Sequence, residues 1–170
     1  KSLSAVARRL RRMPRVVVAE VHGNALAGGC ALLSACDIVC VEPEARIGYP
    51  VHQIGLSPAV SIPTLVNSIT PGDARALMLS GRIIDGREAY RMGLAHQLAE
   101  SREELPSLTA GLCTDLADKG RNALKVTKAW VNEVSGDEDD VMFDATIAAS
   151  EIAARRSTII DRLELTPGGY

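Results

Sequence analysis

The chain has 170 residues, of which 46% are apolar and 3% aromatic, and its formal net charge is −2 at neutral pH. This length and apolar content suit one domain with a sizeable core. The scarcity of aromatic residues argues against a base-stacking surface for nucleic acid, and the charge argues against a polyanion binder. No apolar run approaches the roughly 20 residues of a membrane span, so neither nucleic acid nor a membrane is an expected partner.

The first segment has the pattern of an amphipathic helix that ends before Pro14. Its apolar residues recur at helical spacing: Leu3, Val6, Ala7 and Leu10. The basic run from Arg8 to Arg12 is interpreted as a solvated face of this helix. The segment lacks the apolar stretch of a signal peptide.

A buried strand is predicted from Arg15 to Val21, followed by the turn HGNALAGGC and a short helix over Gly28–Ala35. A helix N-terminus presents unpaired N–H groups and the positive end of the helix dipole, and glycines allow a ligand to approach that backbone. The arrangement suits an oxygen that gains negative charge during a reaction. It lacks the glycine spacings typical of nucleotide phosphate binding. A plain connection between strand and helix is the alternative.

The remaining elements are predicted from periodicity and capping signals. Strands are expected over residues 37–41, 45–49 and 94–99, and helices over 70–79, 85–93, 101–119, 122–134 and 139–163. Strands therefore cluster in the first half and helices in the second, and no linker separates two domains. Four cysteines form no C-x-x-C pair or zinc-binding pattern, which predicts buried free thiols and no metal site: Cys30, Cys36, Cys40 and Cys113.

Four motifs between Arg15 and Ala99 resemble the crotonase (enoyl-CoA hydratase/isomerase) superfamily. They lie in RVVVAEVHGNALAGGCALLSACDIVCVEPEARIGYP, IGLSP and LMLSGRIIDGREAYRMGLAHQL. The resemblance implies an α/β fold of the ββα superhelix type, an acyl-CoA thioester as ligand, and a trimer or a dimer of trimers. It divides the chain into a core over residues 1–99, incomplete at its N-terminus, and a helical oligomerisation segment over 100–170. Coenzyme A enters as part of the substrate, so no cofactor is implied.

In this family two backbone N–H groups bind the thioester oxygen and stabilise an enolate, and one of them maps to Gly28. A preorganised donor of this kind can contribute about 3–4 kcal/mol to a transition state. Around it, the resemblance implies substrate contacts at four positions: Ala25, Leu26, Ala27 and Gly29. The second donor belongs to a segment that precedes Lys1, so we expect the sequence to be part of a longer chain.

The family's hydratases carry glutamates at two positions that are occupied here by Ala31 and Val51, which also map to the substrate site. Neither side chain can transfer a proton, so hydration by paired glutamates is not expected. Tyr49 and His52 flank the second position and are candidate replacements. The alternatives are a packing role for Tyr49 and a surface or structural role for His52.

The loop containing Ser57 and Pro58 would border the acyl pocket, and a serine there typically caps the following helix. Other polar residues have structural or binding interpretations. His22 is expected to pin the glycine turn, Asp37 to be structural, and His96 has no evident partner. The acidic residues 138–140 favour the start of a helix. The basic run Arg8–Arg12 could also contact coenzyme A phosphates. Arg155 and Arg156 could contact either coenzyme A or a neighbouring subunit.

The sequence therefore predicts a cytoplasmic enzyme that processes an acyl-CoA by isomerisation, decarboxylation or hydrolysis rather than standard hydration. A catalytically inactive acyl-CoA or acyl-carrier binding protein is the first alternative. The second is a structural subunit whose partner completes the site.

Overall fold

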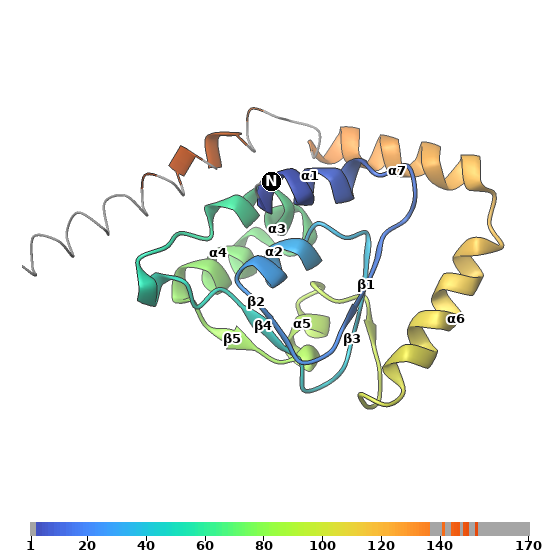
Figure 1. The fold of residues 1–170 in the computed structure, drawn as a ribbon, viewed down its shortest axis with the longest axis horizontal. Coiled ribbons are helices and arrows are strands. Elements are labelled where there is room, and N and C mark those ends of the chain that lie inside the picture. The colour runs from blue at the N-terminus through green and yellow to red at the C-terminus, as the bar shows by residue number, and fades with distance from the viewer. Residues whose placement is uncertain (1–2, 137–140, 142–143, 147, 150–151, 153–170) are drawn as a thin grey trace, which may run out of the picture.

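The computed structural model describes residues 3–136, 141, 144–146, 148–149 and 152. Figure 1 shows α7 at the upper right and α6 down the right-hand side of a body built from the strands and the shorter helices. In chain order the helices and strands are α1 (Leu3–Arg12), β1 (Val18–Val21), β2 (Asn24–Leu26), α2 (Gly28–Leu33), β3 (Ile38–Val41), β4 (Arg46–Gly48), α3 (Ile62–Ser68), α4 (Pro71–Ser80), β5 (Ile83–Ile84), α5 (Gly86–Arg91), β6 (Gln97–Leu98), α6 (Leu105–Ala117) and α7 (Arg121–Ser135), with short 3-10 turns at His52–Ile54 and Ala59–Ser61.

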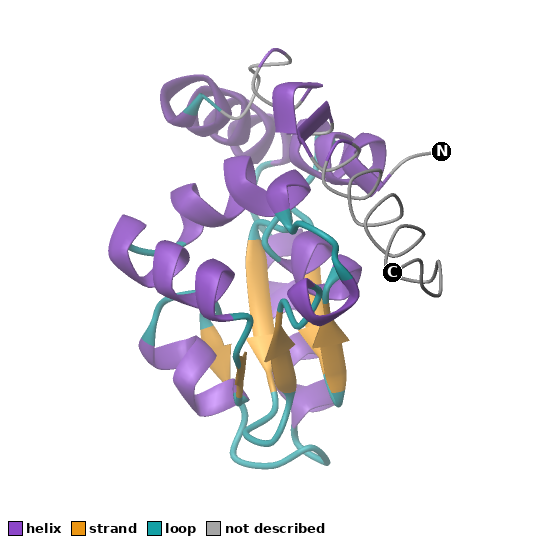
Figure 2. Ribbon diagram, turned by 90° about the vertical axis from the view of Figure 1, so that its left-hand side faces the viewer, coloured by secondary structure: helices purple, strands orange, loops and turns teal. Residues whose placement is uncertain are grey.

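The strands form two three-stranded sheets, which lie at the centre of the helices (Figure 2). One sheet has the order β1-β3-β6 and is parallel throughout; in the other, β4 pairs parallel with β2 and antiparallel with β5. Strands β1 and β3 enter one sheet while β2 and β4 enter the other, and helices follow each of the consecutive pairs β1–β2 and β3–β4 along the chain. This winding confirms the predicted α/β class of the ββα superhelix type.

The core is divided by the sheet that contains β3. Val39 and Val41 belong to the main cluster between the sheets and helices α2 to α5, whereas Cys40 packs with Leu105 beneath α6. Alternate residues of a strand point to opposite faces, so α6 covers one face of this sheet and the site-bearing elements lie on the other.

Lys128 joins α7 to the end of α1 and to the start of β3. Its Nζ donates to the carbonyls of Leu10 and Arg15, each at 3.0 Å, and lies 2.7 Å from Oδ2 of Asp37. The same carboxylate accepts a hydrogen bond from the N–H of Val17. Asp37 therefore holds structural contacts, as expected, and the last carbonyls of α1 are capped by another helix.

Local signals predicted the capped helices well. Thr70 Oγ1 accepts from the N–H of Asp73, and Asp85 Oδ1 accepts from the N–H of Glu88, so both predicted N-caps are confirmed. Gly93 follows α5 in the left-handed conformation, with φ +82°. The separate strand β2 and helix α3 were not predicted.

Other boundaries differ from the expectation. The helix expected from Ser101 begins instead at Leu105, because Pro106 fits the first turn of a helix rather than its interior. Cys30 and Cys40 are buried, as predicted. Cys36 is only partly buried and Cys113 is exposed, so the prediction of a buried thiol is wrong for Cys36 and Cys113. Most of the helix expected over 139–163, with Glu138–Asp140 and Arg155–Arg156, lies outside the described residues. The division at residue 99 stays a prediction.

Candidate functional site

The glycine turn is fixed by a buried acid from a distant part of the sequence. Gly23 turns with φ +71°, and its N–H donates to a carboxylate oxygen of Glu42, a residue only 4% exposed. The His22 side chain, which was expected to pin this turn, is exposed and has its Nδ1 3.4 Å from Arg102. Glu42 is thus the residue that holds the turn, and the 19-residue separation gave no local signal for it.

Ala27 links β2 to α2 in a strained conformation, with φ 49° and ψ −108°. It is the one non-glycine residue with positive φ in the described part of the chain. Its N–H donates to the carbonyl of Gly48 at 2.8 Å, and its own carbonyl accepts the N–H of Ala31 at 3.0 Å. Pairing with β4 on one side and with α2 on the other therefore holds the strained peptide in place.

The first N–H groups of α2 have no acceptor within the described residues. The first helical bond closes at Ala31, which leaves the N–H groups of Gly28 and Gly29 unused. A side-chain methyl at Gly28 would meet Leu3 of α1 at 3.5 Å, an ordinary contact distance, so α1 borders the turn. The backbone thus offers two preorganised donors at the predicted position.

A cavity of about 240 Å³ lies beside this turn, between β1, β2 and α2. It is lined by Ala25 and Gly29 of the predicted set, together with Leu32 and Cys36 among others. The remaining predicted contacts do not line it: Leu26, Ala27, Gly28, Ala31, Val51, Ser57 and Pro58. The structure therefore gathers only part of the predicted substrate set at one cavity.

Both positions that would carry an acid are shielded from solvent. Ala31 is 1% exposed, and Val51 is 9% exposed and packs in the main core. An acid at either position would have to be desolvated. The surroundings of these two positions thus match their apolar side chains.

Tyr49 is buried in the main core with Cys30 of α2, and only 1% of it is exposed. Its hydroxyl is near Cys30, Ser34 and Ser61 but makes no hydrogen bond of ordinary geometry. Burial raises the pKa of Tyr49 well above its usual value, and burial likewise raises the pKa of Cys30 to about 12. Both groups are therefore protonated at neutral pH, so Tyr49 is unsuited to the role of a base.

The structure places His52 beside another turn. The ring Nδ1 of His52 lies 3.3 Å from the position that a Cβ atom at Gly81 would occupy, in the turn after α4. His52 itself is exposed. This position agrees with the surface alternative. Its catalytic role stays a prediction that no described contact supports.

Ser57 and Pro58 begin the short 3-10 turn before α3. Ser57 Oγ accepts the N–H of Ala59 at 3.3 Å. Neither the 3-10 turn nor α3 has a side-chain cap, so the helix cap expected from a serine in this loop is not formed.

His96 does have a partner, although none was evident from the sequence. Its N–H donates to the carbonyl of Val39 at 2.8 Å, and its Nδ1 accepts the N–H of Val39 at 2.9 Å. Burial, and then the charge of Arg11, lower the pKa of His96. The neutral ring that this bond requires is therefore favoured, and His96 is a structural histidine.

Neither a metal cluster nor a membrane helix was found where the structure is described. Among those residues, no three His, Cys, Asp or Glu side chains are placed to hold a metal ion. None of the described helices has the length and apolar character needed to cross a membrane.

Comparison with known proteins gives one consistent family. The sequence profile described as "Enoyl-CoA hydratase/isomerase" matches residues 1–153. The chain is 33% identical over 132 residues to the crotonyl-CoA hydratase of Syntrophomonas wolfei, covering 75% of this chain and 49% of that protein. It is 30% identical over 128 residues to the short-chain-enoyl-CoA hydratase of Clostridium acetobutylicum, again covering 75% and 49%. The chain thus spans about half the length of these relatives.

Solved structures share the fold. A crystal structure of an enoyl-CoA hydratase from Mycobacterium avium matches with a TM-score of 0.81 and 25% identity, over 97% of this chain and 66% of that one. The crystal structure of a methylmalonyl CoA decarboxylase matches with a TM-score of 0.78 over 99% of this chain and 69% of that one, at 14% identity. At such low identity the latter match shows the fold alone.

Proposed function

Because the chain belongs to the enoyl-CoA hydratase/isomerase family, we propose that it processes acyl-CoA thioesters and holds the thioester oxygen at the N–H of Gly28. The relatives named as hydratases act on enoyl-CoA compounds, which supports the substrate class. The coenzyme A portion belongs to the substrate, and no separate cofactor is required.

One observation carries this proposal: the unused N–H groups of Gly28 and Gly29 follow directly on the strained Ala27. Donors fixed before the substrate arrives need no reorganisation when charge develops on an oxygen. The six-residue α2 adds the positive end of its dipole, although so short a helix contributes modestly. The turn is therefore suited to a carbonyl oxygen on its way to an enolate.

The reaction proposed is isomerisation, decarboxylation or hydrolysis rather than hydration. Adding water across a double bond requires one group to activate the water and one to deliver a proton. Ala31 and Val51 do neither, and Tyr49 stays protonated. Of the three, decarboxylation places the smallest demand on the side chains present, because loss of carbon dioxide forms the enolate without a base, whereas isomerisation and hydrolysis need a base that these residues do not supply.

A second candidate is an inactive protein that binds an acyl-CoA or an acyl carrier. The buried, apolar surroundings of residues 31 and 51 favour it, because they offer no proton donor beside the oxyanion turn. The two candidates share the binding step and differ only in turnover. Product analysis with a panel of thioesters separates them.

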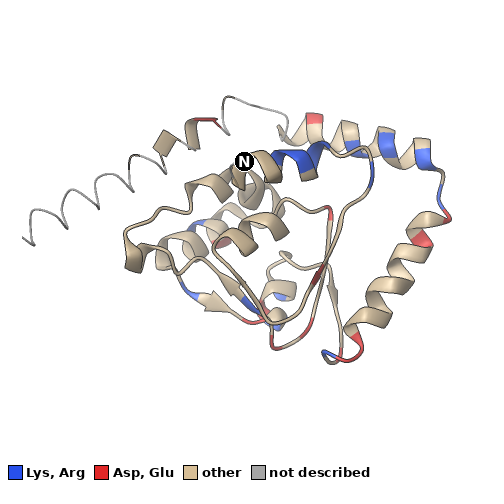
Figure 3. Cartoon of the chain, viewed as in Figure 1, with Lys and Arg blue, Asp and Glu red and all other residues tan. Residues whose placement is uncertain are grey.

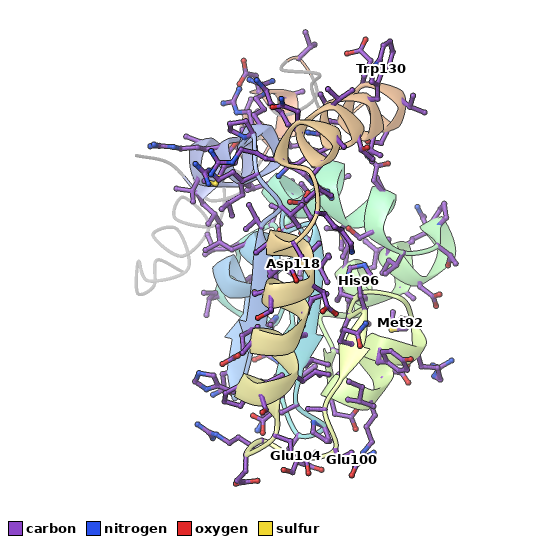
Figure 4. All side chains as sticks on the ribbon, turned by 90° about the vertical axis from the view of Figure 1, so that its right-hand side faces the viewer. Met92, His96, Glu100, Glu104, Asp118 and Trp130 are labelled. Carbon is purple, nitrogen blue, oxygen red and sulfur yellow. The ribbon has the colours of Figure 1, made fainter. Side chains whose placement is uncertain are left out.

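We also propose a cytoplasmic trimer or dimer of trimers. All four cysteines are free, which suits a reducing compartment. Three apolar residues at helical spacing on α7 are exposed: Val126, Trp130 and Val134, at 55%, 65% and 84%. Figure 4 shows Trp130 on the outside of this helix. Apolar side chains gathered at helical spacing on a surface are typical of a contact between subunits.

The experiment compares two variants of the same residue. Gly28→Ala keeps the N–H and introduces only an ordinary contact with Leu3, whereas Gly28→Pro removes the N–H. Loss of one such donor lowers turnover by about 100- to 1,000-fold, so we expect that loss for Gly28→Pro and a change of only a few fold for Gly28→Ala. Because proline restricts the preceding residue, Ala27→Gly/Gly28→Pro serves as a second, relaxed variant.

Unfolding midpoints report whether each variant folds. Equal turnover in wild type and Gly28→Pro would refute the role of Gly28. Thioester binding without any product from the panel would favour the inactive binding protein.

A further inference from the structure

A second cavity, of about 370 Å³, lies at the corner where α6 meets α7. Its walls come from the link between α1 and β1, from β1, from the end of α6 and from the start of α7. The lining residues are Pro14, Arg15, Val16, Val18, Cys113, Leu116, Ala117, Lys119, Arg121 and Leu124. None of them belongs to the glycine turn or to the cavity beside it, so this is a separate site.

Three cations line this cavity, and none is paired within the part of the chain that the structure describes. Arg15, Lys119 and Arg121 are exposed, and no described carboxylate lies within ion-pair distance of them. No acidic residue lines the cavity. Figure 3 shows basic residues along α1, its link to β1 and the first half of α7, with acidic residues near the end of α6. The rim is thus positive in a chain whose net charge is −2.

The rest of the wall is apolar. Val16, Val18, Leu116 and Leu124 are only partly exposed and lie on four different segments. A ligand that touched them would remove apolar surface from water, at about 25 cal/mol per Å². Cations on the rim and apolar groups on the wall together match a molecule with an anionic head and an apolar body.

The backbone bond that fixes one wall of this cavity leaves the cationic group of Arg15 unused. Lys128 donates to the carbonyl of Arg15 at 3.0 Å, which fixes the link between α1 and β1 without using the guanidinium group. The helix α7 starts at the rim after Gly120, with no side-chain cap and no acid in its first turn. The link between α1 and β1 is therefore held in place without its guanidinium group, which is available to a ligand.

We propose that this cavity binds an amphipathic anion: an unbranched apolar chain with one anionic head, either a carboxylate or a phosphate monoester. Arg15, Lys119 and Arg121 contact the head, and the apolar wall takes the chain. The cavity volume is at the small end of the roughly 300–1,000 Å³ typical of small-molecule sites, so the ligand is of medium chain length. The site goes beyond the proposed thioester chemistry and does not depend on it.

Calorimetric titration of the full chain with four probes tests the proposal. Decanoate and decyl phosphate represent the two heads. 1-Decanol carries the chain without charge, and inorganic phosphate carries charge without the chain. We expect one of the two anions to bind, and decanol and inorganic phosphate each to bind at least about tenfold more weakly, the equivalent of 1.4 kcal/mol.

Variants locate the binding. Lys119→Gln/Arg121→Gln removes two rim charges and is expected to weaken the anion at least about tenfold, because charge-assisted contacts are lost. Lys125→Gln, an exposed residue of α7 outside the cavity lining, should leave affinity unchanged. Gly28→Pro, which removes the N–H proposed to hold the thioester oxygen, should bind the anion normally, which separates this site from the thioester site.

The affinity of wild type should fall as salt is raised, a readout that does not depend on the variants folding. The proposal is overturned if neither anion binds, if decanol binds as tightly as the anions, if salt has no effect, or if the double variant, folded by its unfolding midpoint, binds like wild type.

Discussion

Ala27 occupies a backbone conformation that an alanine side chain rarely adopts, at the point where β2 passes into α2. Such strain costs about 1–3 kcal/mol per residue and often lies at functional sites. In this turn the next two N–H groups meet no acceptor among the described residues. The residue thus links local strain to the exposed donors that the proposed chemistry uses.

Replacing Ala27 by glycine should relieve that strain. We expect Ala27→Gly to raise the free energy of unfolding by about 1 kcal/mol, the strain released less the added chain entropy of glycine. Urea denaturation measures the change. Ala25→Gly in the neighbouring strand is the control and should destabilise, since it gains only entropy; a similar loss in both variants would show that Ala27 is unstrained.

His96 should make stability depend on pH in one direction. The folded state lowers its pKa from the ordinary value of 6.5, so the unfolded chain binds the proton more tightly. The contribution of His96 is therefore complete above pH 6.5 and is lost as pH falls through the interval below that value. Urea midpoints at neutral and mildly acid pH should differ less in His96→Gln than in wild type; equal differences would contradict the buried neutral ring.

At the scale of elements, Lys128 holds α7, α1 and β3 together through one ammonium group. Its side chain is 8% exposed, and that of Asp37 is 17% exposed. Truncating one member of a buried pair leaves the other uncompensated, which typically costs about 3–5 kcal/mol. The position of α1, and of its link to β1 beside the larger cavity, thus depends on Lys128, which lies more than a hundred residues later in the sequence.

Lys128→Met should therefore destabilise the protein by about 3 kcal/mol or more. Lys125→Met, three residues earlier and exposed, should stay within about 0.5 kcal/mol of wild type. Chemical denaturation of both variants, under one buffer, gives the comparison. A loss in Lys128→Met no larger than in Lys125→Met would show that the ion pair contributes little.

The same elements show which structure could be predicted from the sequence. The N-caps of α4 and α5 were predictable because Thr70 and Asp85 act on N–H groups three residues away. The strand β2 has three residues and β5 has two, too few for a periodic pattern, and both depend on pairing with β4. Local chemistry was thus readable, whereas pairing between distant segments was not.

At the scale of the whole molecule, the motif order predicted the fold and the place of Gly28. It could not predict Glu42, which supports the turn across 19 residues, or the partner of His96, because both depend on burial and on tertiary contact. The comparisons establish the family for this chain, while the choice of reaction depends on two apolar residues. Ala31 and Val51 therefore carry the most specific functional prediction, which is that the protein does not hydrate an enoyl-CoA.

Crotonyl-CoA should not be hydrated at enzymatic rates. Ala31 and Val51 provide neither a base for water nor an acid for the product. Loss of the enoyl absorbance, followed with and without protein, measures this directly, and a glutamate-bearing hydratase of the family is the positive control. Turnover near the roughly 10 per second typical of enzymes would show that other groups replace the missing acids.

The central claim, that the Gly28 N–H polarises a thioester carbonyl, is tested most directly by the ¹³C signal of that carbonyl in a bound, carbonyl-labelled acyl-CoA. A hydrogen bond from a fixed donor withdraws electron density from the carbonyl, so the signal should move downfield on binding to wild type and to Gly28→Ala. In Gly28→Pro, and in its relaxed form with Ala27→Gly, that shift should be smaller. An unshifted signal in bound wild type, or the same shift in all four proteins, would contradict the assignment of Gly28.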